Sequence, residues 1–286
     1  MNSAPIRSYI ALGDSLSEGL GDRGFEAQRM HCGWTDRLAH LLSASANDAG
    51  HGFTFANLAL RGSKTRSIMT SQLEAAIRQK PDLVTVMAGS NDIFANRQQL
   101  LEVERLLHHG LTRLTMAGIR VLVVNTADPQ HLALTRHLRP KAKRMTQLIN
   151  RVCAQLSLPV LDVHNLQQLA DIRYWCDDMA HFSEHGHTLI ANQAAEQLKL
   201  EYRHVPTPPN AMAYPDRGPV AIGAWLKRDV IPFLIRRIRG RSSGDGLRAK
   251  LPVLTEFYVP ATGVELVRLG TAKKTAPQNP AQTVQS

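Results

Sequence analysis

Four short polar segments contain the residue types needed to attack an acyl group: GDS at 13–15, RGS at 61–63, GSND at 89–92 and DMAH at 178–181. A serine hydroxyl is a poor nucleophile at neutral pH because it holds its proton tightly, so it needs a base, and imidazole titrates in the useful range. The base needs an acceptor on its other ring nitrogen. Ser15, His181 and Asp178 are of these three types, and Asp178 stands three residues before His181. We therefore consider Ser15, His181 and Asp178 candidate catalytic residues.

The same segments offer donors for the negative charge that develops on the acyl oxygen. A backbone N–H at Gly62 would be accessible because no side chain blocks approach, and the Asn91 amide and the Ser15 N–H could join it. Losing one such donor typically costs on the order of 10²–10³ in rate. Each segment taken alone could be an ordinary turn, since glycine, serine, asparagine and aspartate dominate turns. Asp14 and Asp92 are interpreted in that way, as turn and loop hydrogen-bonding residues.

Strand-like and helical patterns alternate along the first two hundred residues, which predicts a doubly wound parallel sheet with a helical layer on each face. The strand-like runs are 8–12, 53–60, 81–89, 119–127 and 158–163, and the helical patterns are about 33–45, 66–79, 97–117, 135–156 and 183–199. Three of the polar segments directly follow the first three strands. Ligands of open α/β sheets bind beyond the carboxyl ends of the strands. We therefore expect these three segments to meet at one edge of the sheet.

Taken together, GDSLS, LALRGSKT, GSND and DMAH resemble the four sequence blocks of the SGNH hydrolases, also called GDSL esterases. They occur in the family's order across about residues 8–200. The resemblance implies a three-layer α/β/α fold with a five-stranded parallel, flavodoxin-like sheet. It implies Ser15 as nucleophile, His181 as general base and Asp178 as the group that orients it. It also implies Gly62 and Asn91 as oxyanion donors beside the Ser15 backbone, with no metal or cofactor.

Two other patterns suggest different chemistry. Residues 19–24 fit G-x-G-x-x-G, but a dinucleotide fingerprint is the tight turn that leaves a strand and opens a helix, and this copy begins seven residues beyond Leu12. His181, His185 and His187, with Cys176, could suggest a metal site. No second pair of ligands stands out beside them, so we do not expect one.

The composition favours a cytoplasmic protein. Three scattered cysteines among 286 residues are too few for a disulfide framework, and their odd number suggests reduced thiols. No basic segment followed by a long apolar stretch opens the chain, so we expect no signal peptide. No uninterrupted apolar run approaches the roughly 18–20 residues of a membrane span.

The last part of the chain has a different texture, and we place a domain boundary between 1–203 and 204–286. Of the net charge of +10, the residues from Glu201 onward contribute 13 − 6 = +7. We predict a proline-rich linker over 204–219, a basic apolar helix over 220–241 and a disordered C-terminus. The charge points to an anionic partner of this extension and not to an acidic substrate of the main domain. A helix docked on the main domain is favoured over contact with an anionic membrane surface, which would make the protein peripheral to the membrane. We do not expect nucleic-acid binding, because no recognisable module is present.

These observations predict a serine esterase that hydrolyses small-molecule carboxylic esters with acetyl or short acyl groups. Lysophospholipids and thioesters remain alternative substrates. The competing class is a non-catalytic or membrane-associated binding protein on the same scaffold. The oligomeric state is left open.

Overall fold

A computed structural model describes residues 5–22, 33–131, 133–204, 243–257 and 266–268. Its centre is a six-stranded mixed sheet with the order β5-β4-β3-β1-β2-β7. The strands are β1 (Ser8–Leu12), β2 (Thr54–Asn57), β3 (Leu83–Met87), β4 (Arg120–Val124), β5 (Val160–Leu161) and β7 (Leu251–Glu256). The first five run parallel, as the sequence predicts, whereas β7 pairs antiparallel with β2.

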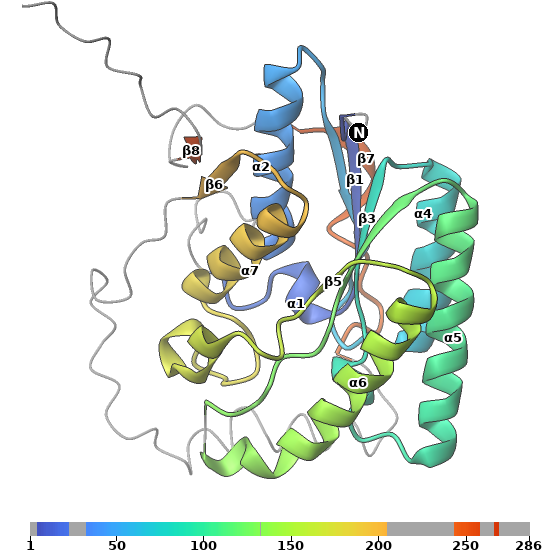
Figure 1. Cartoon of the computed structure of the whole chain (residues 1–286), viewed down its shortest axis with the longest axis vertical. Helices are drawn as coiled ribbons and strands as arrows, with labels where there is room; N and C mark the ends of the chain where they lie inside the picture. Colours follow the sequence, from blue (N-terminus) through green and yellow to red (C-terminus); the bar gives the residue numbers. More distant parts are fainter. Residues whose placement is uncertain (1–4, 23–32, 132, 205–242, 258–265, 269–286) are drawn as a thin grey trace, which may run out of the picture.

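Helices cover both faces of this sheet, so the predicted three-layer α/β/α architecture is confirmed (Figure 1). α2 (Trp34–Asp48) and α7 (Glu184–Gln197) pack on one face. The other face carries α3 (Thr65–Ser67), the π-helical turn η2 (Ile68–Gln72), α4 (Leu73–Gln79), α5 (Arg97–Met116) and α6 (Arg139–Gln155). Each face has its own cluster of buried apolar side chains, because strands buried on both sides need apolar residues at most positions.

The central strand β1 is held in register by polar contacts as well as by the sheet. Tyr9 and Thr85 share a hydrogen bond of 2.7 Å inside the core. At the start of the strand, Asp82 accepts hydrogen bonds from the Arg7 and Ser8 backbones and from the Ser8 hydroxyl. These contacts align β1 with β3, so that the segments following both strands emerge at the same level.

The C-terminal extension contributes a strand that the sequence analysis missed. β7 extends the sheet beyond β2, and Phe257, which follows it, is buried against Phe53, Phe55 and His40. A second, two-stranded sheet joins β6 (Tyr202–His204) and β8 (Leu266–Arg268). Of the predicted linker at 204–219, only His204 is described, and it ends β6. The remainder of the linker, the basic helix at 220–241 and the C-terminus beyond 268 lie outside the described residues. The domain division at residue 203 therefore stays a prediction. Within the predicted extension, however, β7 belongs to the main sheet and Phe257 to its core.

A buried ion pair fastens the extension to α2. Asp36 is fully buried, and its Oδ2 atom lies 2.6 Å from Nζ of Lys250, one residue before β7. Burial raises the pKa of Asp36 to about 6, an effect that Lys250 opposes. The charged form of Asp36 thus depends on a cation supplied by the extension.

Among the described residues, no helix has both the length and the apolar character needed to cross a membrane.

We predict that Lys250→Met lowers the free energy of unfolding by about 3 kcal/mol, because it leaves a buried carboxylate without its cation. Urea unfolding at neutral pH measures this, with Arg248→Met, at an exposed neighbouring position, as the matched control. The double variant Asp36→Asn/Lys250→Met should recover much of the loss. Equal stability of Lys250→Met and wild type would show that the pair does not fasten the extension.

Candidate active site

Ser15 is the first residue of α1 (Ser15–Glu18), a single turn of helix directly after β1. The Asp14 side chain caps this turn by accepting the Leu16 N–H at 3.0 Å. Gln72 clamps the preceding residue, since its side-chain oxygen accepts the Gly13 N–H and its side-chain nitrogen donates to the Gly13 carbonyl, both at 2.9 Å. This strand–turn–helix connection fixes where the Ser15 hydroxyl projects.

Only glycine fits before Asp14. A Cβ atom on Gly13 would lie 2.4 Å from Oγ of Ser17 and 3.0 Å from the Met87 carbonyl oxygen. The close approach of Ser17 in α1, with the end of β3 behind it, therefore requires the glycine of the GDS segment.

The candidate base lies on a tight turn between η6 (Ile172–Tyr174) and α7. An isolated β-bridge between Trp175 and Phe182 closes the turn. Inside it, the Asp178 Oδ1 atom accepts the backbone N–H groups of Ala180 and His181 at 2.9 and 3.0 Å. The Asp178 carboxylate thus stabilises the turn that contains it. The same turn places the His181 side chain beside that carboxylate.

The structure brings Ser15, His181 and Asp178 into one hydrogen-bonded chain. Nδ1 of His181 lies 2.6 Å from Oδ2 of Asp178, and Nε2 lies 2.8 Å from Oγ of Ser15. Because a carboxylate only accepts, Nδ1 carries the proton, and Nε2 presents its lone pair to the serine hydroxyl. Burial opposes ionisation of Asp178, yet hydrogen bonds and the charge of His181 outweigh it and hold the Asp178 pKa well below its usual value.

Cys176 is a further neighbour of this carboxylate. Its Sγ atom lies 2.9 Å from Oδ1 of Asp178, and burial, together with the Asp178 charge, raises the thiol pKa to about 12. The donor atoms of Cys176, Asp178 and His181 all lie within 4.8 Å of one another. A metal would need the thiolate, which this environment disfavours, so the geometry fits a hydrogen-bond network better.

His187 is not brought to this group. Its Nδ1 accepts the Trp34 N–H at 3.1 Å and its Nε2 donates to the Leu20 carbonyl at 3.0 Å. The histidine pattern that suggested a metal therefore includes a buried histidine that joins α2 to the segment after α1.

The other predicted segments meet at the same edge of the sheet. The Asn91 amide nitrogen donates to the Ser63 carbonyl at 3.0 Å and to the Asp14 carboxylate at 3.3 Å. Gly62 has a φ of 74°, in the left-handed region that favours glycine. Its neighbour Arg61 donates its backbone N–H and its guanidinium to Glu18 of α1, which ties the turn to the helix that begins with Ser15.

The predicted structural roles of Asp14 and Asp92 agree with these contacts. Asp14 caps α1, and the Asp92 Oδ2 atom accepts both the backbone N–H and the hydroxyl of Thr65 at 2.8 Å. Asp14 also accepts from Asn91 and so joins the GDS and GSND segments, and Asp92 joins GSND to a residue just after RGS.

A comparison with protein families now identifies the chain. Residues 11–189 match the model of the GDSL-like Lipase/Acylhydrolase family. The chain belongs to this family. It is a serine hydrolase that acts on ester bonds, as the sequence predicts. No curated protein matches it.

Solved structures similar to this family member share its fold. A catalytic mutant of the acetylxylan esterase Axe2 from Geobacillus stearothermophilus superposes with a TM-score of 0.58 at 17% identity, covering 70% of this chain and 98% of its own. A lipase/acylhydrolase from Enterococcus faecalis gives 0.54 at 18% identity, covering 71% and 99%. LAE5, an alpha/beta hydrolase enzyme from the metagenome of Lake Arreo, Spain, gives 0.56 at 19% identity, covering 68% and 95%.

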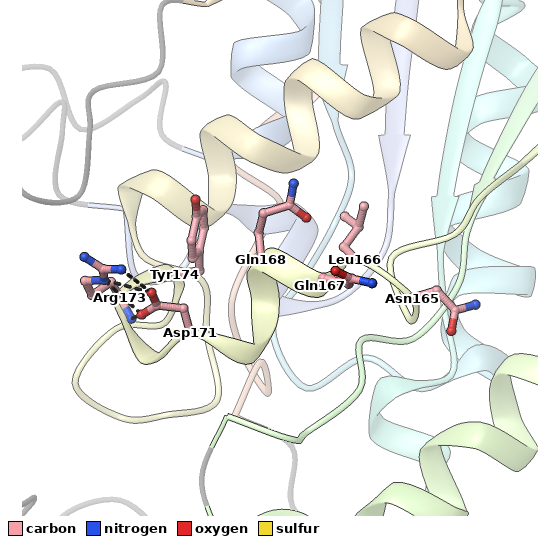
Figure 2. A pocket seen from close by; sticks show the side chains of 7 residues that line it. All are labelled: Asn165, Leu166, Gln167, Gln168, Asp171, Arg173 and Tyr174. Carbon is pink, nitrogen blue, oxygen red and sulfur yellow. Dashed lines mark hydrogen bonds and ion pairs between the residues drawn. The ribbon is translucent and has the colours of Figure 1, made fainter.

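An open hollow of about 830 Å³ lies on the segment between β5 and the turn that carries the base. Figure 2 shows the paired Asp171 and Arg173 at one end and Asn165 at the other. The full lining is Asn165, Leu166, Gln167, Gln168, Asp171, Arg173 and Tyr174. It contains no member of the Ser15–His181–Asp178 chain, so we do not assign it to the ester.

His131 is a residue of this site that the sequence analysis missed. Its ring stacks on Trp175 with centroids 3.9 Å apart and planes 16° apart, and its Nε2 atom donates to the Met179 carbonyl at 3.1 Å. Met179 has a φ of 57°, an uncommon conformation for a side chain of its size. His131 thus supports the Asp178–His181 turn from the segment after β4, as a positioning residue.

We predict that His131→Phe lowers kcat about tenfold with little change in KM, because loss of the Met179 hydrogen bond lets the base shift by a fraction of an ångström. His131→Gln, which can donate from a similar position, should restore part of the rate. Steady-state kinetics on a soluble ester measures both variants. His164→Phe, at a histidine that instead contacts the Thr126 carbonyl, is the matched control. Equal rates for His131→Phe and wild type would exclude the positioning role.

The buried Asp14 carboxyl group should make the free energy of unfolding depend on pH. Burial raises its pKa to about 6, against the hydrogen bond from Leu16 and the charge of His181. Between about pH 4 and pH 6 the folded chain therefore keeps a proton that the unfolded chain has lost, so this group reduces stability as the pH rises through that window.

Asp14→Asn should remove this dependence while keeping an acceptor for the Leu16 N–H. The free energy of unfolding of the variant minus that of wild type should rise by about 2–3 kcal/mol from pH 4 to pH 7. Urea unfolding at several pH values tests this, and a difference that stays constant with pH would contradict it.

Proposed function

We propose that this family member is an esterase for carboxylic esters with acetyl or short acyl groups, in which Ser15 is the nucleophile, His181 the general base and Asp178 its orienting partner. The observation that supports this most directly is the hydrogen-bonded chain from Asp178 through His181 to Ser15. Every role that the reaction needs is filled by a residue of the right type, which argues against a non-catalytic binding protein.

In the first half-reaction, Oγ of Ser15 attacks the ester carbonyl carbon while Nε2 of His181 takes the hydroxyl proton. The resulting imidazolium keeps its Nδ1 proton in the hydrogen bond to Asp178, whose low pKa keeps the carboxylate charged. Collapse of the tetrahedral intermediate breaks the bond to the alcohol, which leaves with the proton from Nε2. The acyl group is then bonded to Ser15.

In the second half-reaction, a water molecule replaces the alcohol. His181 takes one of its protons as its oxygen attacks the acyl carbon, and returns the proton to Oγ of Ser15 as the carboxylic acid leaves. Protons and bonds balance without a metal or cofactor.

The oxyanion is assigned to the N–H groups of Ser15 and Gly62 and to the Asn91 amide. The first N–H groups of a helix have no acceptor within the helix, so the Ser15 N–H is suited to bind an oxygen of the substrate. Asn91 would exchange its long 3.3 Å contact with Asp14 for the substrate oxygen and keep the shorter bond to Ser63. Gly62 and Asn91 belong to segments tied to each other and to α1, which favours a preorganised site.

The acyl preference draws support from the comparisons. The similar Axe2 structures are of an acetylxylan esterase, and its catalytic mutants replace a serine, an aspartate or a histidine by alanine. Their aspartate and histidine stand three positions apart, as Asp178 and His181 do here. Lysophospholipids and thioesters are the second class of substrate, because the lipase/acylhydrolase neighbour shares the same fold.

We also propose a cytoplasmic location, since Cys153 and Cys176 are free thiols that a reducing compartment would preserve. The possible contact of 220–241 with an anionic membrane concerns residues outside those described. It stays a prediction that vesicle binding of the full chain can test.

We predict that Ser15→Ala lowers kcat on p-nitrophenyl acetate by on the order of 10⁴-fold while the protein stays folded. Rates on p-nitrophenyl esters from acetate to palmitate measure both the loss and the acyl preference. Ser71→Ala, at an exposed serine of η2, is the matched control. Ser15-dependent labelling by a fluorophosphonate reports an activated serine independently of the chosen ester. No hydrolysis and no labelling of folded wild type would overturn the proposal in favour of a binding protein.

A further inference from the structure

One segment beside the site is rich in cations and has no acidic residue of its own. Residues 129–161 contain no aspartate or glutamate, and their six cationic side chains are Arg136, Arg139, Lys141, Lys143, Arg144 and Arg151. Residues 1–200 have a net charge of only +3, the total of +10 less the +7 of the remainder. The positive charge of the main domain is therefore concentrated in residues 129–161, although the net charge of the domain is small.

The start of α6 and the residues before it lie against the segment that carries Asn91. Nη2 of Arg144 donates to the Ala95 carbonyl at 3.3 Å, and Nζ of Lys141 lies 4.7 Å from the centroid of the partly exposed Phe94 ring. Deeper in the helix, Met145 packs so closely on Gly89 that a Cβ there would lie 2.9 Å from its side chain. The cations thus stand at the rim of the carboxyl edge, near the predicted oxyanion donor.

The same stretch of chain also reaches the candidate base. His131, five residues before Arg136, contacts both Trp175 and Met179 of the turn that holds Asp178 and His181. His131 therefore lies beside the turn that carries the base, and Lys141 and Arg144 lie against the residues that follow Asn91.

Most other arginines on this part of the surface have carboxylate partners. Arg66 and Arg105 pair with Glu102, Arg113 with Glu74, and Arg151 with Glu104. Within the segment itself, Arg139 pairs with Asp128. Among the described residues, no ion pair involves the exposed side chains that we call the basic rim: Arg136, Lys141, Lys143 and Arg144.

The position of the basic rim is also unfavourable for the helix that carries most of it. The first turn of α6 contains no acidic residue and has Lys141 close to its N-terminal end. Helix N-termini favour negative charge, so cations placed there reduce stability. A cluster that repels itself and opposes its helix dipole is well suited to attract an anion from outside.

We propose that the basic rim recognises an anionic group, a carboxylate or a phosphate, in the alcohol part of the ester. This inference rests on the proposed function. In this proposal the alcohol part extends from Ser15 toward the rim, because a short acyl group is too small to reach it. Exposed cations act over roughly one Debye length, about 10 Å at 0.1 M salt, so the recognition is electrostatic and sensitive to ionic strength.

The test compares two aryl acetates that differ mainly in charge, para-acetoxybenzoate and its neutral counterpart para-acetoxybenzamide. The measured quantity is the ratio of their kcat/KM values, which removes effects common to both esters. Lys141→Glu/Lys143→Glu should lower this ratio about tenfold at low ionic strength, and Lys141→Gln/Lys143→Gln should lower it by less. Adding salt to about 0.5 M should bring wild type toward the variants.

The matched control is Arg78→Glu/Lys80→Glu, the same charge change at the C-terminal end of α4, on the opposite edge of the sheet. It should leave the ratio within about twofold of wild type. The reversal at α6 should keep or raise the melting temperature, because glutamates suit a helix N-terminus. A fall in the ratio without a fall in stability therefore cannot come from unfolding.

An unchanged ratio in Lys141→Glu/Lys143→Glu, with both esters still hydrolysed, would overturn this inference and leave the proposed function intact. Loss of all hydrolysis and of fluorophosphonate labelling in wild type would overturn both. Cosedimentation with phosphatidylglycerol but not phosphatidylcholine vesicles, lost in the same variant while the ester ratio stays constant, would show that the rim binds a lipid surface, against the proposal.

Discussion

The bond between Nδ1 of His181 and Asp178 is the contact on which the proposed chemistry of this molecule depends. Imidazole can accept a proton from Ser15 only if its other nitrogen carries one, and the carboxylate fixes that arrangement. Much of the surrounding turn maintains this bond. Two backbone N–H groups and a thiol orient the carboxylate, and a buried β-bridge closes the loop behind it. The turn thus holds the Asp178 carboxylate in place, and the carboxylate in turn orients the His181 ring.

The second requirement is that segments far apart in the chain converge on one serine. Parallel strands deliver their carboxyl ends to one edge, and contacts between the following turns then lock them together. Glu18 holds the Arg61 turn, Asn91 holds Ser63, and Gln72 clamps Gly13. These contacts hold the immediate surroundings of Ser15, Gly62 and Asn91, the groups that we propose act on the ester. Such support is what allows donors to point at an oxyanion without reorganisation.

The sequence was sufficient for the five parallel strands, the flanking helices and the meeting of Ser15, His181 and Asp178. These depend on local apolar patterns and on short motifs at strand ends, and both can be recognised from the sequence alone. His131 could not be found in this way, because its role arises from a stack on Trp175 and a bond to a backbone carbonyl 48 residues away. A histidine in a loop has no distinguishing local pattern.

β7 was missed for a related reason. Its sequence, LPVLTE, contains a proline and follows the polar, glycine-containing stretch 241–250, so its local pattern favours a loop. What makes it a strand is the unpaired edge of β2, together with the buried space that Phe257 fills. The raised pKa values of Asp14, Cys153 and Cys176 could not be predicted from the sequence either. They follow from the loss of contact with solvent and not from residue type.

The antiparallel strand β7 also has a consequence for the order in which the chain becomes complete on the ribosome. All segments of the site have been synthesised by residue 187, but the cover of β2 arrives only about 65 residues later, with residues 251–256. Until then the nascent sheet has an open edge that can pair with other chains, and Asp36 lacks its cation. The finished edge is safer, because Pro252 is exposed on β7 and cannot donate to an added strand. The synthesis of β7 thus closes the β2 edge of the main sheet to pairing with other chains.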